Sequence, residues 1–171
     1  MDLSSNMAPR VLDGRLALVT GAGQGNGRAI AIGLAKAGAR VVVTDINAEP
    51  VRQTEAAIRA AGGEAWAHVL DVTSREACVA LAEKVAADIG PVDPVVNNAG
   101  IIIREGIDSP RVMDNLRRTL DVNVVGSFHV VHEKFIKNKL RFETFLFRGI
   151  EFLWEKSNRF QISLKLCLGV D

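Results

Sequence analysis

Short apolar runs alternate with segments of helical period through the first 132 residues of the chain. The runs are rich in valine and leucine, and they predict strands at residues 15–20, 40–45, 65–72 and 92–97. The second of them, Arg40–Asp45 (RVVVTD), has no alternation in its middle. Such a run is typical of a parallel strand that is covered on both faces of a sheet.

The segments between the runs carry helix signals. Gly38 and the pair Gly62-Gly63 are placed to end the first two helices. Thr73 and Glu76 have the spacing of a capping box at the start of a third helix, and Ser109-Pro110 predicts the start of a long fourth one. Strands that alternate with helices predict βαβ units. Because crossovers are right-handed, we expect an α/β fold, a Rossmann-type doubly wound parallel sheet that stops after the fourth strand and the long helix following it.

A glycine-rich turn, Thr20–Gly27 (TGAGQGNG), follows the first predicted strand and opens the first predicted helix. Glycines let the main chain turn tightly and approach a pyrophosphate, while a helix N-terminus offers N–H groups and the positive end of its dipole. The alternative is a tight turn with a structural role alone. The candidate cofactor contacts in this turn are Gly21, Gln24, Gly25, Asn26 and Gly27.

Asp45 ends the second predicted strand, 18 residues after Gly27. A carboxylate there can accept hydrogen bonds from both ribose hydroxyls of an adenosine. A 2′-phosphate would meet a like charge, which costs about 4 kcal/mol at about 4 Å and an effective dielectric of about 20, and Gln24 offers no positive charge to offset it. The pattern therefore favours NAD over NADP; the alternative is a solvated Asp at a strand end.

The chain has 21 Lys and Arg against 20 Asp and Glu, a net charge of +1. This balance implies no strong overall electrostatic field that would attract nucleic acid or an anionic membrane. The N-terminus has no signal-peptide pattern, and no apolar run is long enough to span a membrane. Cys78 and Cys167 lack a metal-like spacing, and His129 and His132 are more typical of a packed or surface pair than of a zinc site. We expect a cytoplasmic protein without a metal, a nucleic-acid partner or a membrane partner.

The composition changes near residue 133. Alanine is absent after Ala99, and six of the seven phenylalanines lie beyond residue 132. We interpret residues 1–132 as the nucleotide-binding half and residues 133–171 as an atypical tail, which is either of foreign origin, such as a shifted frame or a splice variant, or a divergent genuine C-terminus. Alternating residues from Phe160 to Leu168 predict a strand, and one hypothesis is that it pairs with the free edge of the fourth strand.

Taken together, four motifs resemble those of the short-chain dehydrogenase/reductase family over residues 10–132. They are TGxxxGxG at Thr20–Gly27, Asp71-Val72 after the third strand, NNAG at 97–100 and VNVVG at 122–126. The resemblance implies that Gly21, Gly25 and Gly27 frame the pyrophosphate, although Asn26 stands where the family usually has an aliphatic residue.

The other motifs carry implied roles of the same kind. Asp71 and Val72 would contact adenine, whereas the NNAG residues would pin the sheet and line the ribose: Asn97, Asn98, Ala99 and Gly100. Asn123 would be the family's catalytic asparagine, in a distorted stretch of helix. The structural alternatives are a turn cap at Asp71, a tie between strand ends at Asn98, and a helix-surface position for Asn123.

The sequence contains no tyrosine. In the family, a Tyr-x-x-x-Lys pair and a serine carry out hydride transfer, so the resemblance implies an NAD-dependent alcohol/ketone oxidoreductase by lineage and an inactive or nearly inactive chain on its own. The alternatives are a non-catalytic nucleotide-binding module and a subunit that joins a homo-oligomer, or a full-length family member, through the helix from Pro110.

Overall fold

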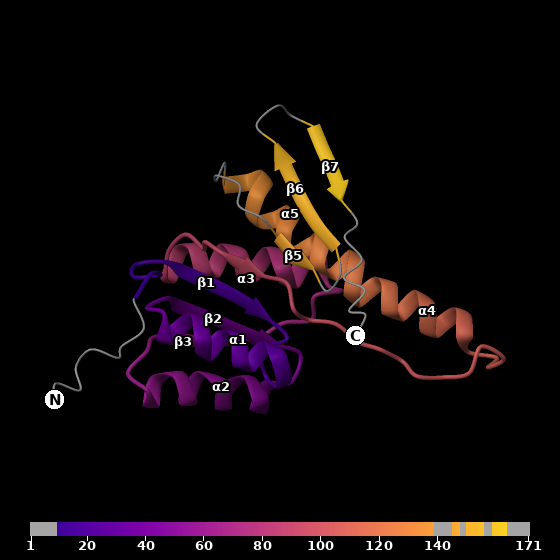
Figure 1. Cartoon of the computed structure of the whole chain (residues 1–171), viewed down its shortest axis with the longest axis horizontal. Coiled ribbons are helices and arrows are strands. Elements are labelled where there is room, and N and C mark those ends of the chain that lie inside the picture. Colours follow the sequence, from indigo (N-terminus) through magenta and orange to yellow (C-terminus); the bar gives the residue numbers. More distant parts are fainter. Residues whose placement is uncertain (1–9, 139–144, 148–149, 156–158, 164–171) are drawn as a thin grey trace, which may run out of the picture.

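A computed structural model describes residues 10–138, 145–147, 150–155 and 159–163. One sheet contains four parallel strands: β1 (Leu16–Thr20), β2 (Arg40–Asp45), β3 (Ala65–Val69) and β4 (Val95–Val96). Their spatial order is β3-β2-β1-β4. The α/β fold with a Rossmann-type parallel sheet is therefore confirmed, and Figure 1 shows the sheet between its helices.

Helices cover both faces of this sheet. They are α1 (Gly25–Lys36) and α2 (Ala48–Ala60) on one face, and α3 (Arg75–Asp88) and α5 (Ser127–Asn138) on the other. The helix α4 (Val112–Leu120) has no buried residue, extends away from the sheet (Figure 1) and leads through the π-helix η2 (Asp121–Gly126) into α5. Successive side chains of a strand point to opposite faces of the sheet, so each strand contributes side chains to the hydrophobic core on either face. Val19 and Val43 pack with Ala31, Val51 and Ile58 of α1 and α2. The opposite core joins Leu18 and Val42 to Cys78, Leu81 and Val85 of α3 and Val130 of α5.

The strand order places a topological switch point between β1 and β4. The chain moves from β1 to β2 and β3 on one side, and then crosses to β4 on the other side of β1. At such a point the segments leaving the carboxyl ends of two neighbouring strands diverge, and ligands of doubly wound sheets bind there. Here these segments are the glycine-rich turn after β1 and the NNAG segment after β4.

Several boundaries differ from the sequence prediction. The third strand ends at Val69 rather than at residue 72, and the fourth covers only Val95–Val96. The capping box at Thr73 is wrong by one residue, because Ser74 is the N-cap of α3 and its hydroxyl accepts from the N–H of Ala77 at 3.2 Å. Thr73 instead bonds to Asp71.

The long helix predicted from Ser109-Pro110 begins at Val112 and is interrupted by η2. Ser109 still contributes at its start, since Ser109 Oγ accepts from the N–H of Arg111 at 3.1 Å. The helix then resumes as α5 and continues past residue 132 to Asn138. The division of the chain at residue 132 stays a prediction.

Three tail strands form a separate antiparallel sheet of order β5-β6-β7. They are β5 (Phe145–Phe147), β6 (Ile150–Glu155) and β7 (Arg159–Ser163). The hypothesis that the strand beginning near Phe160 pairs with β4 is wrong for the described residues, because β7 pairs with β6. A neighbouring strand separated by only residues 156–158 closes a much shorter loop than distant β4, which favours this pairing. Residues 164–168 of the predicted strand lie outside the described residues.

Two features are absent from the described residues. No helix among them combines the length and apolar content needed to cross a membrane. Within the same ranges, no three His, Cys, Asp or Glu side chains lie together so as to hold a metal ion.

Candidate functional site

The hydroxyl of Thr20 ties the two diverging segments together at the switch point. Thr20 is the last residue of β1 and is 1% exposed. Its Oγ1 accepts hydrogen bonds from the N–H groups of Asn98 and Ala99, both at 3.0 Å. The sequence analysis included Thr20 in the glycine-rich motif but did not predict it as a site residue. The signal that could have identified it is a hydroxyl at the end of a buried strand, directly before a glycine turn.

Asn98 makes the reverse connection. Its Nδ2 donates to the carbonyl oxygens of Thr20 and Gly21, both at 3.0 Å. Asn98 therefore ties the strand ends, as the structural alternative from the sequence expected. Its neighbour Asn97 is buried, with Nδ2 at 3.5 Å from the Ser127 carbonyl oxygen, and its Oδ1 makes no hydrogen bond within the described part of the chain.

Two glycines of the turn, Gly25 and Gly27, differ in the space around their Cα atoms. A Cβ atom on Gly27 would lie 2.1 Å from the Gly21 carbonyl oxygen and 2.4 Å from Asn98 Nδ2, so only glycine fits there. Gly25 has φ +53°, and no atom lies within 4 Å of the position a Cβ would take. Gly27 thus permits the close packing of the turn, whereas the space beside Gly25 is open.

The N-terminus of α1 opens into that space. Its N-cap residue, Gln24, makes no side-chain capping hydrogen bond, and Gln24, Gly25 and Asn26 are all exposed. The first N–H groups of a helix have no intrahelical acceptor, and together with the dipole they favour a bound anion. This end of α1 therefore has the features of a phosphate site.

Asp45 lies at the rim of the same turn. Its Oδ2 accepts from the Gly23 N–H at 2.9 Å, and its Oδ1 accepts from the Asn47 N–H at 3.0 Å. These bonds fix the carboxylate at the end of β2 beside the turn, and Asp45 remains partly exposed. Its negative charge is thus held next to the open N-terminus of α1.

Asp71 and Val72 form a turn one strand further along the sheet. Asp71 is exposed, and its Oδ1 accepts from the N–H and the hydroxyl of Thr73 at 2.9 and 2.7 Å. This is the turn cap that the sequence left open as the alternative for Asp71. The carbonyl oxygen of Val72 lies 3.1 Å from Nδ1 of His129 on α5, a contact that sequence reasoning missed.

Asn123 lies in η2, so the helix distortion implied by the resemblance is present. Its Nδ2 donates to the Ile101 carbonyl oxygen at 2.9 Å, and its Oδ1 accepts from the Ile101 N–H at 2.8 Å. A helix-surface position for Asn123 is therefore wrong. The amide group instead binds the segment that follows Gly100, and its catalytic role stays a prediction.

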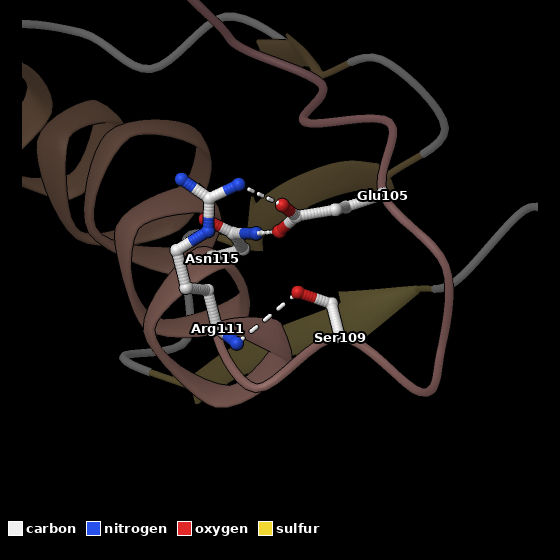
Figure 2. A network of polar contacts seen from close by, with 4 residues as sticks. All are labelled: Glu105, Ser109, Arg111 and Asn115. Carbon is white, nitrogen blue, oxygen red and sulfur yellow. Dashed lines mark hydrogen bonds and ion pairs between the residues drawn. The ribbon is translucent and has the colours of Figure 1, made fainter.

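A second polar network fixes the loop between β4 and α4 (Figure 2). The carboxylate of Glu105 binds the guanidinium of Arg111 and the side-chain amide of Asn115. Burial works against ionisation of Glu105, but hydrogen bonds from Arg111, Ser109 and Asn115 outweigh it and hold the pKa of Glu105 below its ordinary value. The loop between β4 and α4 is thus held near its start, where Asn123 binds Ile101, and near its end, where Glu105 binds Arg111 and Asn115.

The family model described as short chain dehydrogenase matches residues 15–138. The chain belongs to the short-chain dehydrogenase family. Every residue assigned above to the site falls within the matched range, from Thr20 to His129.

Curated relatives support this membership. The 7alpha-hydroxysteroid dehydrogenase of Escherichia coli strain K12 is 44% identical over 119 residues, which are 70% of this chain and 46% of that protein. Mouse estradiol 17-beta-dehydrogenase 11 is 35% identical over 115 residues, covering 67% of this chain and 38% of the relative. The chain thus spans less than half the length of these short-chain dehydrogenases.

Solved structures of the family superpose on the same region. The 7alpha-hydroxysteroid dehydrogenase structure with NADH and 7-oxo glycochenodeoxycholic acid has a TM-score of 0.68 at 42% identity, over 73% of this chain and 48% of the other. A citronellol catabolism dehydrogenase from Pseudomonas aeruginosa PAO1 also gives 0.68, at 34% identity, over 77% and 53% of the two chains.

Proposed function

We propose that this chain binds NAD(H) at the switch point, as the cofactor-binding half of an oxidoreductase that acts on an alcohol or ketone. The observation that carries the proposal is the N-terminus of α1, which has no side-chain cap and faces open space beside Gly25. The cofactor would supply the hydride chemistry. The residues expected to hold it are those of the glycine turn, the strand ends and the adenine turn: Gly21, Gln24, Gly25, Asn26, Gly27, Asp45, Asp71, Val72, Asn97, Asn98, Ala99 and Gly100.

Titration of the purified chain with NADH, followed by fluorescence, tests the proposal. A matched pair of variants gives it a control, because Gly25 (φ +53°) and Gly62 (φ +82°) both have positive φ and open space at the Cβ position. Gly25→Ala and Gly62→Ala therefore carry similar backbone strain, about 1 kcal/mol. We expect saturable binding that Gly25→Ala weakens by about tenfold or more, equivalent to about 1.4 kcal/mol. Equal affinity of the two variants would contradict the proposal.

We further propose that the cofactor is NAD rather than NADP. The carboxylate of Asp45 is held beside the turn by the N–H groups of Gly23 and Asn47. Because it is fixed there, it cannot swing away from a 2′-phosphate without losing both bonds. NADPH is expected to bind more weakly than NADH, and competition between the two against the same chain measures the ratio.

Turnover is a separate part of the proposal. The chain contains no tyrosine, and loss of a positioned acid/base group lowers a rate by about 10²–10⁴-fold. We propose that the chain alone is inactive or nearly so, with Asn123 as the catalytic-site residue it retains. A rate above background with a panel of alcohols and carbonyl compounds would refute this.

A subunit-interaction role has one observation in its favour. Met113, Leu116 and Leu120 of α4 are 54%, 48% and 47% exposed, and Val124 of η2 is 45% exposed. Their spacing of three and four residues puts them on one face of the helix, as expected for a surface covered in a homo-oligomer or by a full-length family member. Sedimentation of the purified chain tests this role. A cytoplasmic location and the absence of a nucleic-acid partner stay predictions.

A further inference from the structure

His129 reaches from α5 to the Asp71–Val72 turn. Its Nδ1 lies 3.1 Å from the carbonyl oxygen of Val72, a residue 57 positions earlier in the chain. A carbonyl oxygen can only accept, so Nδ1 must carry the proton of this hydrogen bond. The contact therefore requires a proton on Nδ1 of His129.

The π-helix η2, which leads directly into α5, is packed closely against the same turn. Gly126, the last residue of η2, lies so near that a Cβ on it would be 2.6 Å from Cγ2 of Val72. Val72 is 6% exposed, and its carbonyl oxygen also lies 3.8 Å from Cys78 Sγ, a weak contact. The main chain at Val72 is thus confined by η2 on one side and by the start of α3 on the other.

The start of this turn is tied to the sheet, because the N–H of Leu70 donates to the carbonyl oxygen of Asp45 at the end of β2, at 2.9 Å. The bonds from Thr73 to Asp71 Oδ1 lie within the turn itself and would survive a rotation of the whole turn. The bond from His129 crosses to a different helix and would not. The bond from His129 therefore adds, to the tie at Leu70 and the packing of Val72, a constraint on the orientation of the turn that comes from α5.

The same stretch of helix also holds the other side of the site. Six residues before His129, Asn123 binds both main-chain groups of Ile101 in the segment after β4. One continuous piece of chain thus contacts both the Asp71–Val72 turn, which follows β3, and the residue after the NNAG segment, which follows β4.

We infer that His129 is a positioning residue of the nucleotide site: its hydrogen bond to the Val72 carbonyl completes the set of contacts that hold the Asp71–Val72 turn in the orientation that takes an adenine base. The inference rests on the proposed function, because it needs adenine at this turn. It assigns to His129 no contact with the base and no proton transfer.

The test compares two substitutions of His129 in the whole chain. His129→Asn keeps an N–H donor close to the position of Nδ1, whereas His129→Leu keeps bulk and removes the donor. Phe128→Leu is the control for a general change in α5, since Phe128 is the preceding residue and is 57% exposed. The measurements are dissociation constants for NADH and for AMP, which contains the adenine half alone, together with the denaturation midpoint.

We expect His129→Leu to weaken NADH and AMP by the same factor, about three- to tenfold, and His129→Asn and Phe128→Leu to bind within about twofold of the unaltered chain. A purely structural role would lower the denaturation midpoint and leave affinity unchanged at temperatures where the protein is folded. If the unaltered chain binds neither NADH nor AMP, the proposed function fails. If it binds both and His129→Leu binds equally well, or if His129→Asn does not restore affinity, this inference alone fails.

A measurement on the unaltered chain gives a check that does not depend on folding of a variant. Nitrogen-15 NMR of the imidazole distinguishes the two neutral tautomers. The hydrogen bond to Val72 requires the form protonated at Nδ1, and finding the Nε2-protonated form would overturn the inference.

Discussion

Replacing Thr20 by valine isolates the polar tie at the switch point, because the two side chains have nearly the same shape. The hydroxyl accepts from two main-chain N–H groups, those of Asn98 and Ala99, both at 3.0 Å. Thr20 itself is 1% exposed, and its two donors are partly buried, so water does not freely replace the lost acceptor. A buried donor left without a partner costs about 1–3 kcal/mol. For two donors that are only partly buried, we expect a loss of about 2–4 kcal/mol in the free energy of unfolding.

The matched control is Thr20→Ser, which keeps the acceptor oxygen and removes one methyl group. Loss of a buried methyl group typically costs about 0.5–1.5 kcal/mol. Equilibrium unfolding in urea gives both values, provided that the dependence on denaturant is the same in the three proteins. If valine proves no more destabilising than serine, within about 0.5 kcal/mol, the hydroxyl does not hold the site together and the reasoning is refuted.

Three other predictions concern the turn and the loop before α4. Gly27→Ala should lower the free energy of unfolding by about 3 kcal/mol because its Cβ would meet the Gly21 carbonyl oxygen at 2.1 Å, whereas Gly25→Ala should lower it by about 1 kcal/mol; equal losses in urea would contradict this. Asp45→Ser should shift the ratio of NADPH to NADH affinity toward NADPH by about tenfold or more, and an unchanged ratio in competition titrations would count against the charge argument. Because the pKa of Glu105 is lower in the folded protein than in the unfolded chain, its ionised carboxylate stabilises the fold at pH values above the unfolded pKa. This stabilisation is lost as the pH falls through the pKa of the folded protein. Glu105→Gln should therefore flatten the stability profile below the ordinary pKa of a glutamate, and an unaltered dependence of stability on pH in that range would exclude this contribution.

The parallel sheet was predictable because the apolar runs of the sequence indicate strands that are buried on both faces. The run Arg40–Asp45 is apolar without alternation and forms β2 over those same residues, with its central valines fully buried. Gly38 and Gly62, each with positive φ in the structure, follow the ends of α1 and α2 as expected. The Rossmann-type doubly wound topology then followed from the handedness of the crossovers.

Apart from the tie between strand ends through the Asn98 side chain, the contacts that close the site were not predictable. Nothing in the sequence indicates that the hydroxyl of Thr20 meets main-chain groups 78 and 79 residues later, or that the Asn123 amide meets both groups of Ile101. Such contacts depend on how far each strand runs before it leaves the sheet, and strand ends are set by neighbouring strands. The early end of β3 at Val69 shows this, since the apolar residues Leu70 and Val72 follow it in the sequence.

His129 shows a different reason for a missed residue. Its spacing from His132 drew attention to a possible pair, yet its partner is a main-chain carbonyl on another element. Main-chain acceptors have no signature in a sequence, so side chains that bind them are recognised only when the fold is known.

The 78-residue separation between Thr20 and Asn98 also affects the order in which the molecule assembles. The units β1-α1-β2 and β2-α2-β3 join strands that are close in sequence, and they can pair while the chain is still emerging from a ribosome. The hydroxyl of Thr20 can accept its two hydrogen bonds only after β4 has paired with β1, and closing so long a loop is entropically costly. Residues Thr20–Gly27 are therefore expected to acquire their final geometry late in folding, after the strands beside them have already formed.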